Sequence, residues 1–180
     1  MDGCNADDLS RAECMIAKLL SRWLDGIREV PGFQNAFLLQ VPEMGVRETR
    51  HIQGDYLLSL MDIYKQKDFT DCIGFGAHPI DTLPRPTWLN DPETSYPRRW
   101  YFQIPFRSLI VKKLVNLLVA GRCLSATHEA FGCIRPTVQC MVIGEAAGTA
   151  AALAVQQAIP LRQLDWQKLR NQLKANGARC

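Results

Sequence analysis

One stretch near the carboxyl end constrains the fold more than any other. The nearly continuous apolar run Leu114 to Ala120 has the length and composition of a strand buried on both faces of a sheet. Residues 121–135 are then expected to form a loop. Pro136 is expected at the first helical position, where its missing N–H costs nothing, and the helix is expected to run to about Gln157.

The predicted helix is apolar on nearly every side. Its polar residues form a narrow stripe at Glu145, Thr149 and Gln156. A helix with this pattern is normally covered by protein on several faces. Its glutamate and glutamines argue against a position in lipid, so no membrane-spanning segment is expected.

A strand, a loop and a helix N-terminus in succession are a common ligand-binding arrangement. Ligands bind at the carboxyl ends of strands in open α/β sheets. The helix N-terminus adds unpaired N–H groups and a partial positive charge, which favour an anion or an electron-rich carbonyl. The residues alone therefore predict a polar or anionic ligand near Arg135, Pro136 and Thr137.

Local patterns predict the remaining elements. Ser10 and Glu13 fit a capping box that opens an amphipathic helix, and Val30-Pro31-Gly32 ends it. Asp165 is the expected N-cap of the last helix, which Asn176-Gly177 closes in a left-handed cap. The other expected elements are a short helix at 57–65, strands at 72–75 and 99–104, and an irregular proline-rich stretch at 78–97.

The composition narrows the class of function. Apolar residues make up 47% and charged residues 22%, which argues against disorder. The net charge of +3 is spread along the chain, so no nucleic-acid partner is expected. The 7 cysteines and 3 histidines lack metal-ligand spacing, so no metal site is expected. The first residues, MDGCNADDLS, do not form a signal peptide, which leaves a cytoplasmic location as the default.

Several stretches of the chain resemble one family, the FAD-dependent oxidoreductases with a glutathione-reductase-type FAD fold. Its C-terminal flavin-closing segment is similar to VNLLVAGRCLSATHEAFGCIRPTVQCMVIGEAAGTAAALA. Other regions of the family are similar to VPGFQNAFLLQVPEMGVRETRHIQGDYLL, HPIDTLP, YFQIPFRSLIVKKL and LDWQKLRNQLKANGA. Such proteins begin with a strand, a G-x-G-x-x-G turn and a helix that bind the ADP part of FAD, and this sequence contains no such turn. The resemblance implies the C-terminal portion of a two-domain FAD-binding fold, α/β overall and α+β when taken alone.

The resemblance also implies a set of cofactor-binding residues: Ala120, Gly121, Arg122, Ser125, Arg135, Pro136 and Thr137. Residues 120–122 would end the last central strand beside the ribityl and pyrophosphate part of FAD. Residues 135–137 would place the helix N-terminus against the flavin N1–C2=O edge, where N–H donors raise the reduction potential. Ser125, Thr127 and His128 would line the loop near the ring. His128 is the candidate catalytic residue, with a solvated loop histidine as the alternative.

Two functions fit this interpretation. In the first, the chain is part of an FAD-dependent oxidoreductase that supports hydride transfer from a small organic substrate to flavin. Residues 1–110 would hold the leading helix and a β-rich substrate-facing region, and residues 111–180 would complete the FAD-binding domain. In the second, the chain is a catalytically inert fragment or subunit that needs a separate N-terminal FAD-binding partner. A hydrolase is disfavoured because the sequence has no G-x-S-x-G elbow.

Overall fold

A computed structural model describes residues 1–41, 43–82 and 100–180. Its contacts divide the chain into two compact units, Met1–Arg50 and His51–Cys180, and each unit is described by itself. The functional division expected at residue 110 stays a prediction. Most of the proline-rich stretch expected at 78–97 lies outside the described residues.

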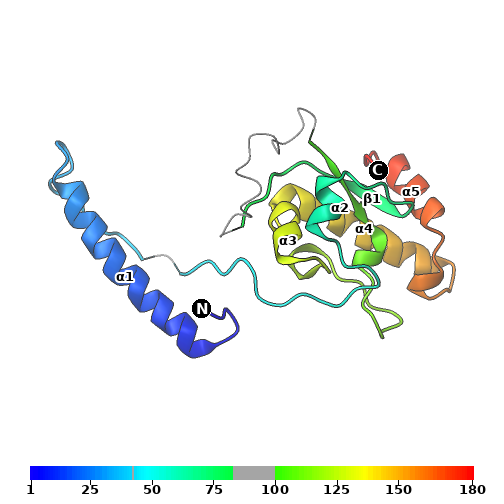
Figure 1. Cartoon of the computed structure of the whole chain (residues 1–180), viewed down its shortest axis with the longest axis horizontal. Coiled ribbons are helices and arrows are strands. Elements are labelled where there is room, and N and C mark those ends of the chain that lie inside the picture. The colour runs from blue at the N-terminus through cyan, green and yellow to red at the C-terminus, as the bar shows by residue number, and fades with distance from the viewer. Residues whose placement is uncertain (42, 83–99) are drawn as a thin grey trace. The chain divides into compact units, whose positions relative to one another are not determined.

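The first unit contains one helix, α1 (Ala6–Arg28), and otherwise irregular chain (Figure 1). Asn5 is the N-cap, and its side chain accepts hydrogen bonds from the N–H groups of Asp7 and Asp8 at 2.9 and 3.2 Å. The capping box expected at Ser10 is therefore wrong. Asn5 satisfies the first free N–H groups more than a turn earlier, and the two aspartates suit the positive end of the helix dipole.

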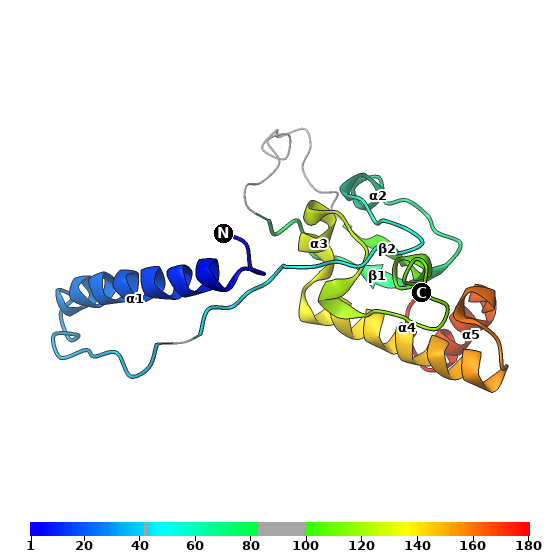
Figure 2. The ribbon, with the colours of Figure 1, turned by 90° about the horizontal axis from the view of Figure 1, so that it is seen from below.

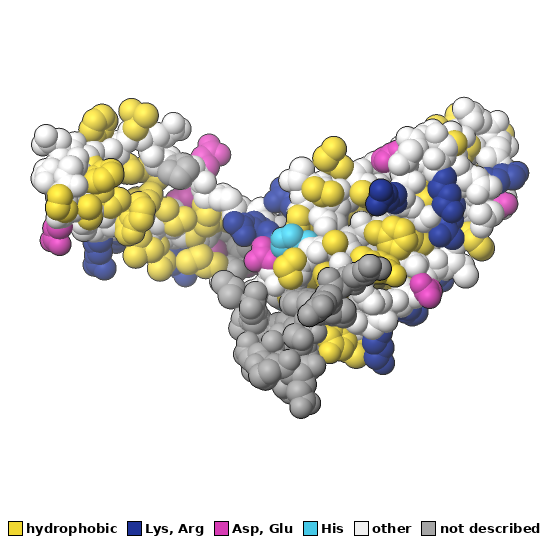
Figure 3. Space-filling model, turned by 90° about the horizontal axis from the view of Figure 1, so that it is seen from above, with side chains coloured by type: hydrophobic (Ala, Val, Ile, Leu, Met, Phe, Trp, Pro, Cys, Tyr) yellow, Lys and Arg dark blue, Asp and Glu magenta, His cyan; other side chains and the backbone are white. Residues whose placement is uncertain are grey.

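The apolar side of α1 is thinly covered. Ala12 is the one buried residue of the helix, while Met15, Leu19 and Trp23 are 48%, 59% and 70% exposed. These three lie four residues apart and form a stripe along the helix. Apolar side chains also gather on the face of this unit seen in Figure 3. The helix is confirmed, but its apolar face finds little to pack against within the unit.

The second unit is built around a small antiparallel sheet. Strand β1 (Cys72–Gly76) pairs with β2 (Phe102–Pro105), with Gly76 opposite Phe102 and Gly74 opposite Ile104. Helix α2 (Leu60–Tyr64) contacts β2 and the long helix α4 (Thr137–Gln156) contacts β1, so the sheet lies between them (Figure 2). Helices α3 (His128–Ile134) and α5 (Trp166–Ala175) complete the unit.

The chain is thus mostly helical, with one two-stranded antiparallel sheet among the described residues. The predicted α/β class holds only in part, because no described strands form a parallel sheet. Several local predictions are confirmed. Helix α2 falls within 57–65, β1 covers 72–75, Asp165 caps α5, and Gly177 has a φ of +95°.

Two glycines let the layers approach closely. A Cβ atom at Gly74 would lie 2.3 Å from Cγ1 of Val142 on α4, and one at Gly76 would lie 2.2 Å from Cζ of Phe102. Both distances are below ordinary contact, so only glycine fits at these positions. The core around them is fully buried and includes Leu58, Ile63, Phe102, Ile104, Leu109, Phe131 and Ile143.

The apolar run at 114–120 is not a buried strand, and this expectation is wrong. An isolated bridge joins Ile110 to Leu118, and the side chains of Leu114, Val115 and Leu117 are 47%, 65% and 44% exposed. A strand buried on both faces needs a neighbouring strand at each edge and cover on each side. The described residues of this unit supply neither.

Helix α4 is confirmed close to its predicted bounds, but its environment differs. Pro136 has a φ of −59° and a ψ of 153°, so it is the N-cap rather than the first helical residue. One side of the helix is buried, and it carries Gln139, Ile143, Ala146, Ala150 and Ala154. Val138, Met141 and Val155 are at least two-thirds exposed, so cover on several faces is not observed. By length and composition alone, α4 could also cross a bilayer, a test that helices of globular cores also pass.

Candidate functional site

The chain after the apolar run turns against the start of α4. Gly121 opens a short 3-10 helix, η4 (Gly121–Cys123), with a φ of +73° that favours glycine. A Cβ atom at Gly121 would lie 4.0 Å from Sγ of Cys140, in the first turns of α4. Helix η4 also contacts α3. The structure therefore brings Gly121 close to the N-terminal end of α4.

The N-terminus of α4 has free hydrogen-bond donors. Pro136 provides no side-chain cap, and the first N–H bonded to its carbonyl is that of Cys140, at 3.0 Å. The N–H groups of Thr137 and Val138 have no partner among the described residues, and both residues are exposed. Free donors at the positive end of a helix dipole suit an anion or an electron-rich carbonyl.

The first turn of α4 also contains an unpaired buried acceptor. Gln139 is 6% exposed, and its Oε1 has no hydrogen-bond partner among the described residues. A buried polar atom without a partner costs free energy, and such an atom often belongs to a functional site. Neither the free donors nor this acceptor are satisfied by the chain itself.

Arg135 is tied to another segment of the unit. Its Nη2 donates to the Asp81 carboxylate at 2.5 Å and to the Asp81 backbone carbonyl at 3.0 Å. The Arg135 side chain is 14% exposed and that of Asp81 is 55% exposed, so only the arginine side of the ion pair is shielded from water. Asp81 neutralises much of the positive charge that the sequence placed at this position. The two residues are 54 positions apart, and no sequence spacing pointed to the pair.

Arg122 supplies the other cation of the region. Its side chain lies on the exposed surface of η4, close enough to Cys140 for the two to interact electrostatically. Burial raises the pKa of the Cys140 thiol, and the positive charge of Arg122 opposes that rise. Arg122 thus adds positive potential beside the first turn of α4.

The loop predicted at 121–135 is partly wrong, because α3 occupies its second half. Thr127 caps this helix by accepting from the N–H of Ala130 at 3.4 Å. His128 is the first helical residue and is exposed. A threonine two positions before Glu129 was the sequence signal for this helix start, since both suit a helix N-terminus.

Ser125 lies deeper than a loop residue would. It is 2% exposed, its N–H donates to Ser108 at 3.3 Å, and its carbonyl accepts from Leu58 at 3.1 Å. A Cβ atom at Gly54 would lie 2.7 Å from Cβ of Ser125, so the backbone of residue 54 passes directly against it. The roles expected of Ser125, His128 and the cofactor-binding residues stay predictions.

A second polar cluster was not singled out in the sequence. Asp71 is 4% exposed, and Arg107 donates to it from Nε at 2.9 Å and from Nη2 at 3.1 Å. The Arg107 guanidinium also lies 5.3 Å from the centre of the Tyr56 ring. The hydrogen bonds that Arg107 donates to the Asp71 carboxylate raise the pKa of Arg107. No local pattern predicts this pair, because its members are 36 positions apart.

The cluster continues through the start of α2. The Tyr56 hydroxyl donates to Asp62 at 3.0 Å, and Lys67 Nζ lies 3.2 Å from the same carboxyl group. Ser59 and Asp62 form a capping box. Burial would raise the pKa of Asp62, but hydrogen bonds from Ser59, Tyr56 and Lys67 outweigh it and hold that pKa below its usual value. Among the described residues, no group of three His, Cys, Asp or Glu side chains is placed to hold a metal ion.

Comparison with known proteins gives one family. No curated protein and no solved structure matches the chain. The family model described as FAD dependent oxidoreductase matches residues 3–173, which is nearly the whole sequence and includes both units. The chain therefore belongs to the FAD-dependent oxidoreductase family.

Proposed function

We propose that this chain contributes the flavin-closing part of an oxidoreductase that transfers hydride from a small organic substrate to FAD. The observation that carries the proposal is the N-terminus of α4, where the N–H groups of Thr137 and Val138 have no partner among the described residues. The family implies FAD, and the N1–C2=O edge of a flavin presents the acceptors that these donors need. FAD, when bound, supplies the redox chemistry.

The contribution of the chain itself is electrostatic. The flavin edge becomes anionic when the ring is reduced, so the donors and the helix dipole stabilise the reduced form and raise the reduction potential. Arg122 would add a cation for the phosphates or another anion. His128 remains the candidate for moving a proton at the substrate, and a role as a solvated histidine remains its alternative.

The ADP part of FAD must be held by another segment of polypeptide. The sequence has no G-x-G-x-x-G turn, so we propose that an N-terminal FAD-binding part supplies it. Support comes from two exposed apolar surfaces. One is formed by Leu114, Val115 and Leu117, and the other by Val138 and Met141 on α4. Exposed apolar patches of this kind mark interaction sites.

The second candidate is a subunit that is inert by itself. The same exposed surfaces favour it, since a chain that buries α4 on one side needs a partner to cover the other. In the first case the partners are a small-molecule substrate and the FAD-binding part, and in the second case the partner is the FAD-binding part. We propose no nucleic-acid partner and no membrane span. We propose a cytoplasmic location as the default.

A substitution at Thr137 tests the flavin site. Thr137→Pro removes the first free N–H, and proline is tolerated at the start of a helix. Pro136 already has the extended backbone that a residue before proline requires. In protein that includes the FAD-binding part, we expect the flavin potential to fall by roughly 30 mV, from a loss of about 1.5 kcal/mol. Thr137→Ala keeps the N–H and should leave the potential unchanged. Equal potentials in both variants would remove the proposed role of α4.

A second measurement separates the two candidates. We expect this chain alone to retain no FAD and to aggregate, because its apolar surfaces lack cover. Joined to, or expressed with, a segment encoded upstream that carries the G-x-G-x-x-G turn, it should give a soluble yellow protein. Substrate-dependent bleaching of the flavin absorbance supports the oxidoreductase, and a yellow complex that no substrate reduces supports the inert subunit. A stable yellow monomer of this chain alone would contradict the need for a partner.

A further inference from the structure

A pocket in the second unit lies apart from the start of α4. It measures about 290 Å³ and is lined by residues from η3 (Phe106–Ser108), from η5 (Leu161–Gln163) and from the start of α5. Helix η5 follows the C-terminal end of α4, whereas the proposed flavin site lies at its N-terminal end. The 20 residues of α4 span about 30 Å. The pocket is therefore a separate site from the proposed flavin site.

One side of the pocket is apolar, while Thr70, Asp71, Arg107 and Arg162 make the rest of its lining polar. Phe106, Ile110 and Leu164 are at most 6% exposed and form the buried side. Trp166 is 41% exposed, so its indole borders both the pocket and the solvent. A pocket of this size, with buried apolar walls and an aromatic ring at its edge, fits a ligand of one or two rings.

Arg107 supplies the polar recognition. Its Nε and Nη2 are bound to Asp71, its backbone N–H donates to the same carboxylate at 2.9 Å, and its guanidinium lies over Tyr56. These contacts hold the guanidinium in one orientation. Its Nη1 has no partner among the described residues, so donors on the remaining edge are free. A guanidinium edge binds a carboxylate through two parallel hydrogen bonds.

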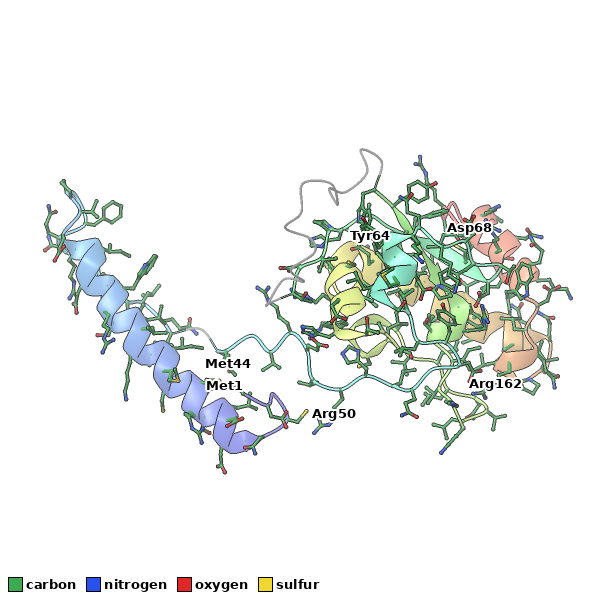
Figure 4. The ribbon with its side chains drawn as sticks, in the orientation of Figure 1. Met1, Met44, Arg50, Tyr64, Asp68 and Arg162 are labelled. Atoms are coloured by element: carbon green, nitrogen blue, oxygen red, sulfur yellow. The ribbon has the colours of Figure 1, made fainter. Side chains whose placement is uncertain are left out.

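Arg162 has a different role in the same pocket. Arg162 is labelled in Figure 4. Its Nε and Nη2 donate to Asp55 at 2.7 and 3.1 Å, and it also donates to the backbone carbonyls of Val111 and Leu114. These bonds tie η5 to the loop after η3 and occupy the polar edges of Arg162. Arg162 thus builds the wall, and Arg107 is left as the cation with donors for a ligand.

We propose that this pocket binds a small aromatic carboxylate. The ring would lie against Phe106 and Trp166, and the carboxylate would accept hydrogen bonds from the free edge of Arg107. Asp71 in the pocket wall and Asp55 beside Arg162 are each already paired with an arginine, so they offer a ligand no acceptor. The proposal does not rest on the flavin site.

Calorimetric titration with benzoate of protein that includes the FAD-binding part tests the proposal, with benzamide as the neutral probe of the same shape. We expect benzoate to bind with a dissociation constant in the millimolar range or tighter, and at least about tenfold more tightly than benzamide. Equal affinities, or no binding of benzoate, would overturn the proposal.

Variants locate the binding in the pocket. Thr70 is exposed at the pocket wall, so Thr70→Glu should fold normally and weaken benzoate binding about tenfold, by repelling the carboxylate or by occupying Arg107. Thr70→Gln is the matched control and should change the affinity by less than about twofold. Arg107→Lys keeps the charge beside Asp71 but lacks the planar edge, and it should lose most of the preference for benzoate over benzamide. Unchanged benzoate affinity in both Thr70→Glu and Arg107→Lys would overturn the site.

Discussion

Helices α1 and α4 were predicted from different sequence signals and reach different outcomes. Helix α1 was predicted from apolar periodicity and α4 from Pro136 and the long apolar stretch after it, and both form. Helix α1 buries Ala12 alone, whereas α4 packs a full stripe against β1 and α5. The difference is that the second unit supplies a sheet and further helices, while the first supplies only irregular chain. Periodicity predicts that a helix has an apolar face, and the rest of the fold decides whether that face is covered.

Truncation of large side chains should give the largest difference between the two units. Phe102 is 1% exposed in the core beside Gly76, so Phe102→Ala should lower the free energy of unfolding by about 3–5 kcal/mol. Trp23 is 70% exposed on α1, and Trp23→Ala should change it by less than about 0.5 kcal/mol. Urea unfolding followed by circular dichroism measures both. Similar losses would mean that the Trp23 face of α1 is covered in solution.

The reactivity of the cysteine thiols compares exposed and buried sites in the two units through a single reaction. Cys14 on α1 and Cys123 in the second unit are exposed, whereas Cys133 on α3 is buried. Burial raises the pKa of the Cys133 thiol from 9.0 to about 12. The thiolate is the reactive form, so Cys133 should react with a disulfide reagent at least about 1,000-fold more slowly than an exposed thiol.

The measurement follows the release of the reagent's chromophore under native conditions. Cys14→Ser and Cys123→Ser should each remove one fast phase and leave the slowest phase unchanged. A fast phase lost only in Cys133→Ser would show that α3 opens readily, and would end the picture of a well-packed second unit.

Local signals in the sequence predicted local structure well. The caps at Asp165 and Gly177, the helix at 137–156 and strand β1 each depend on residues within a few positions of one another. The run at 114–120 was misread because its burial depends on strands that the described residues do not contain. An apolar run shows that a segment can be buried, but it does not show whether a neighbouring strand is present to bury it.

The same distinction between local and tertiary features applies to the candidate site. Free donors at the start of α4 were predictable, since Pro136 cannot cap a helix with a side chain. The Arg135–Asp81 and Arg107–Asp71 pairs were not, because each joins residues that only the tertiary fold brings together. Arg135 was expected to bind the cofactor or to satisfy backbone carbonyls at a helix end, and the structure pairs it with Asp81.

Breaking one ion pair in each unit should give a smaller difference in the free energy of unfolding. Asp71→Asn breaks a two-bonded pair whose carboxylate is 4% exposed, and it should cost about 2 kcal/mol. Asp25 on α1 lies 3.6 Å from Arg28 in an exposed pair, so Asp25→Asn should cost about 0.3 kcal/mol. The check is again the free energy of unfolding, at low and at high salt. A loss in Asp71→Asn that disappears at high salt would mark the pair as a surface interaction.

Acid titration should give the smallest effect, and it is confined to the second unit. The pKa of Asp62 lies below its ordinary value of 3.8, because the hydrogen bonds from Ser59, Tyr56 and Lys67 outweigh the cost of burial. The folded state therefore holds this proton more weakly than the unfolded state does. The stability that Asp62 contributes is present above pH 3.8 and is lost as the pH falls through the lowered folded pKa.

Asp62→Asn should lower the free energy of unfolding by about 1 kcal/mol near neutral pH, the size of a helix cap, and by less in acid. Asn5→Ala, which removes the cap of α1, should leave the acid midpoint of the second unit where it is, since that residue belongs to the other unit. An acid midpoint that shifts in Asn5→Ala and not in Asp62→Asn would reverse the assignment, and would show that the thinly packed helix, rather than the capped turn at Ser59, responds to acid.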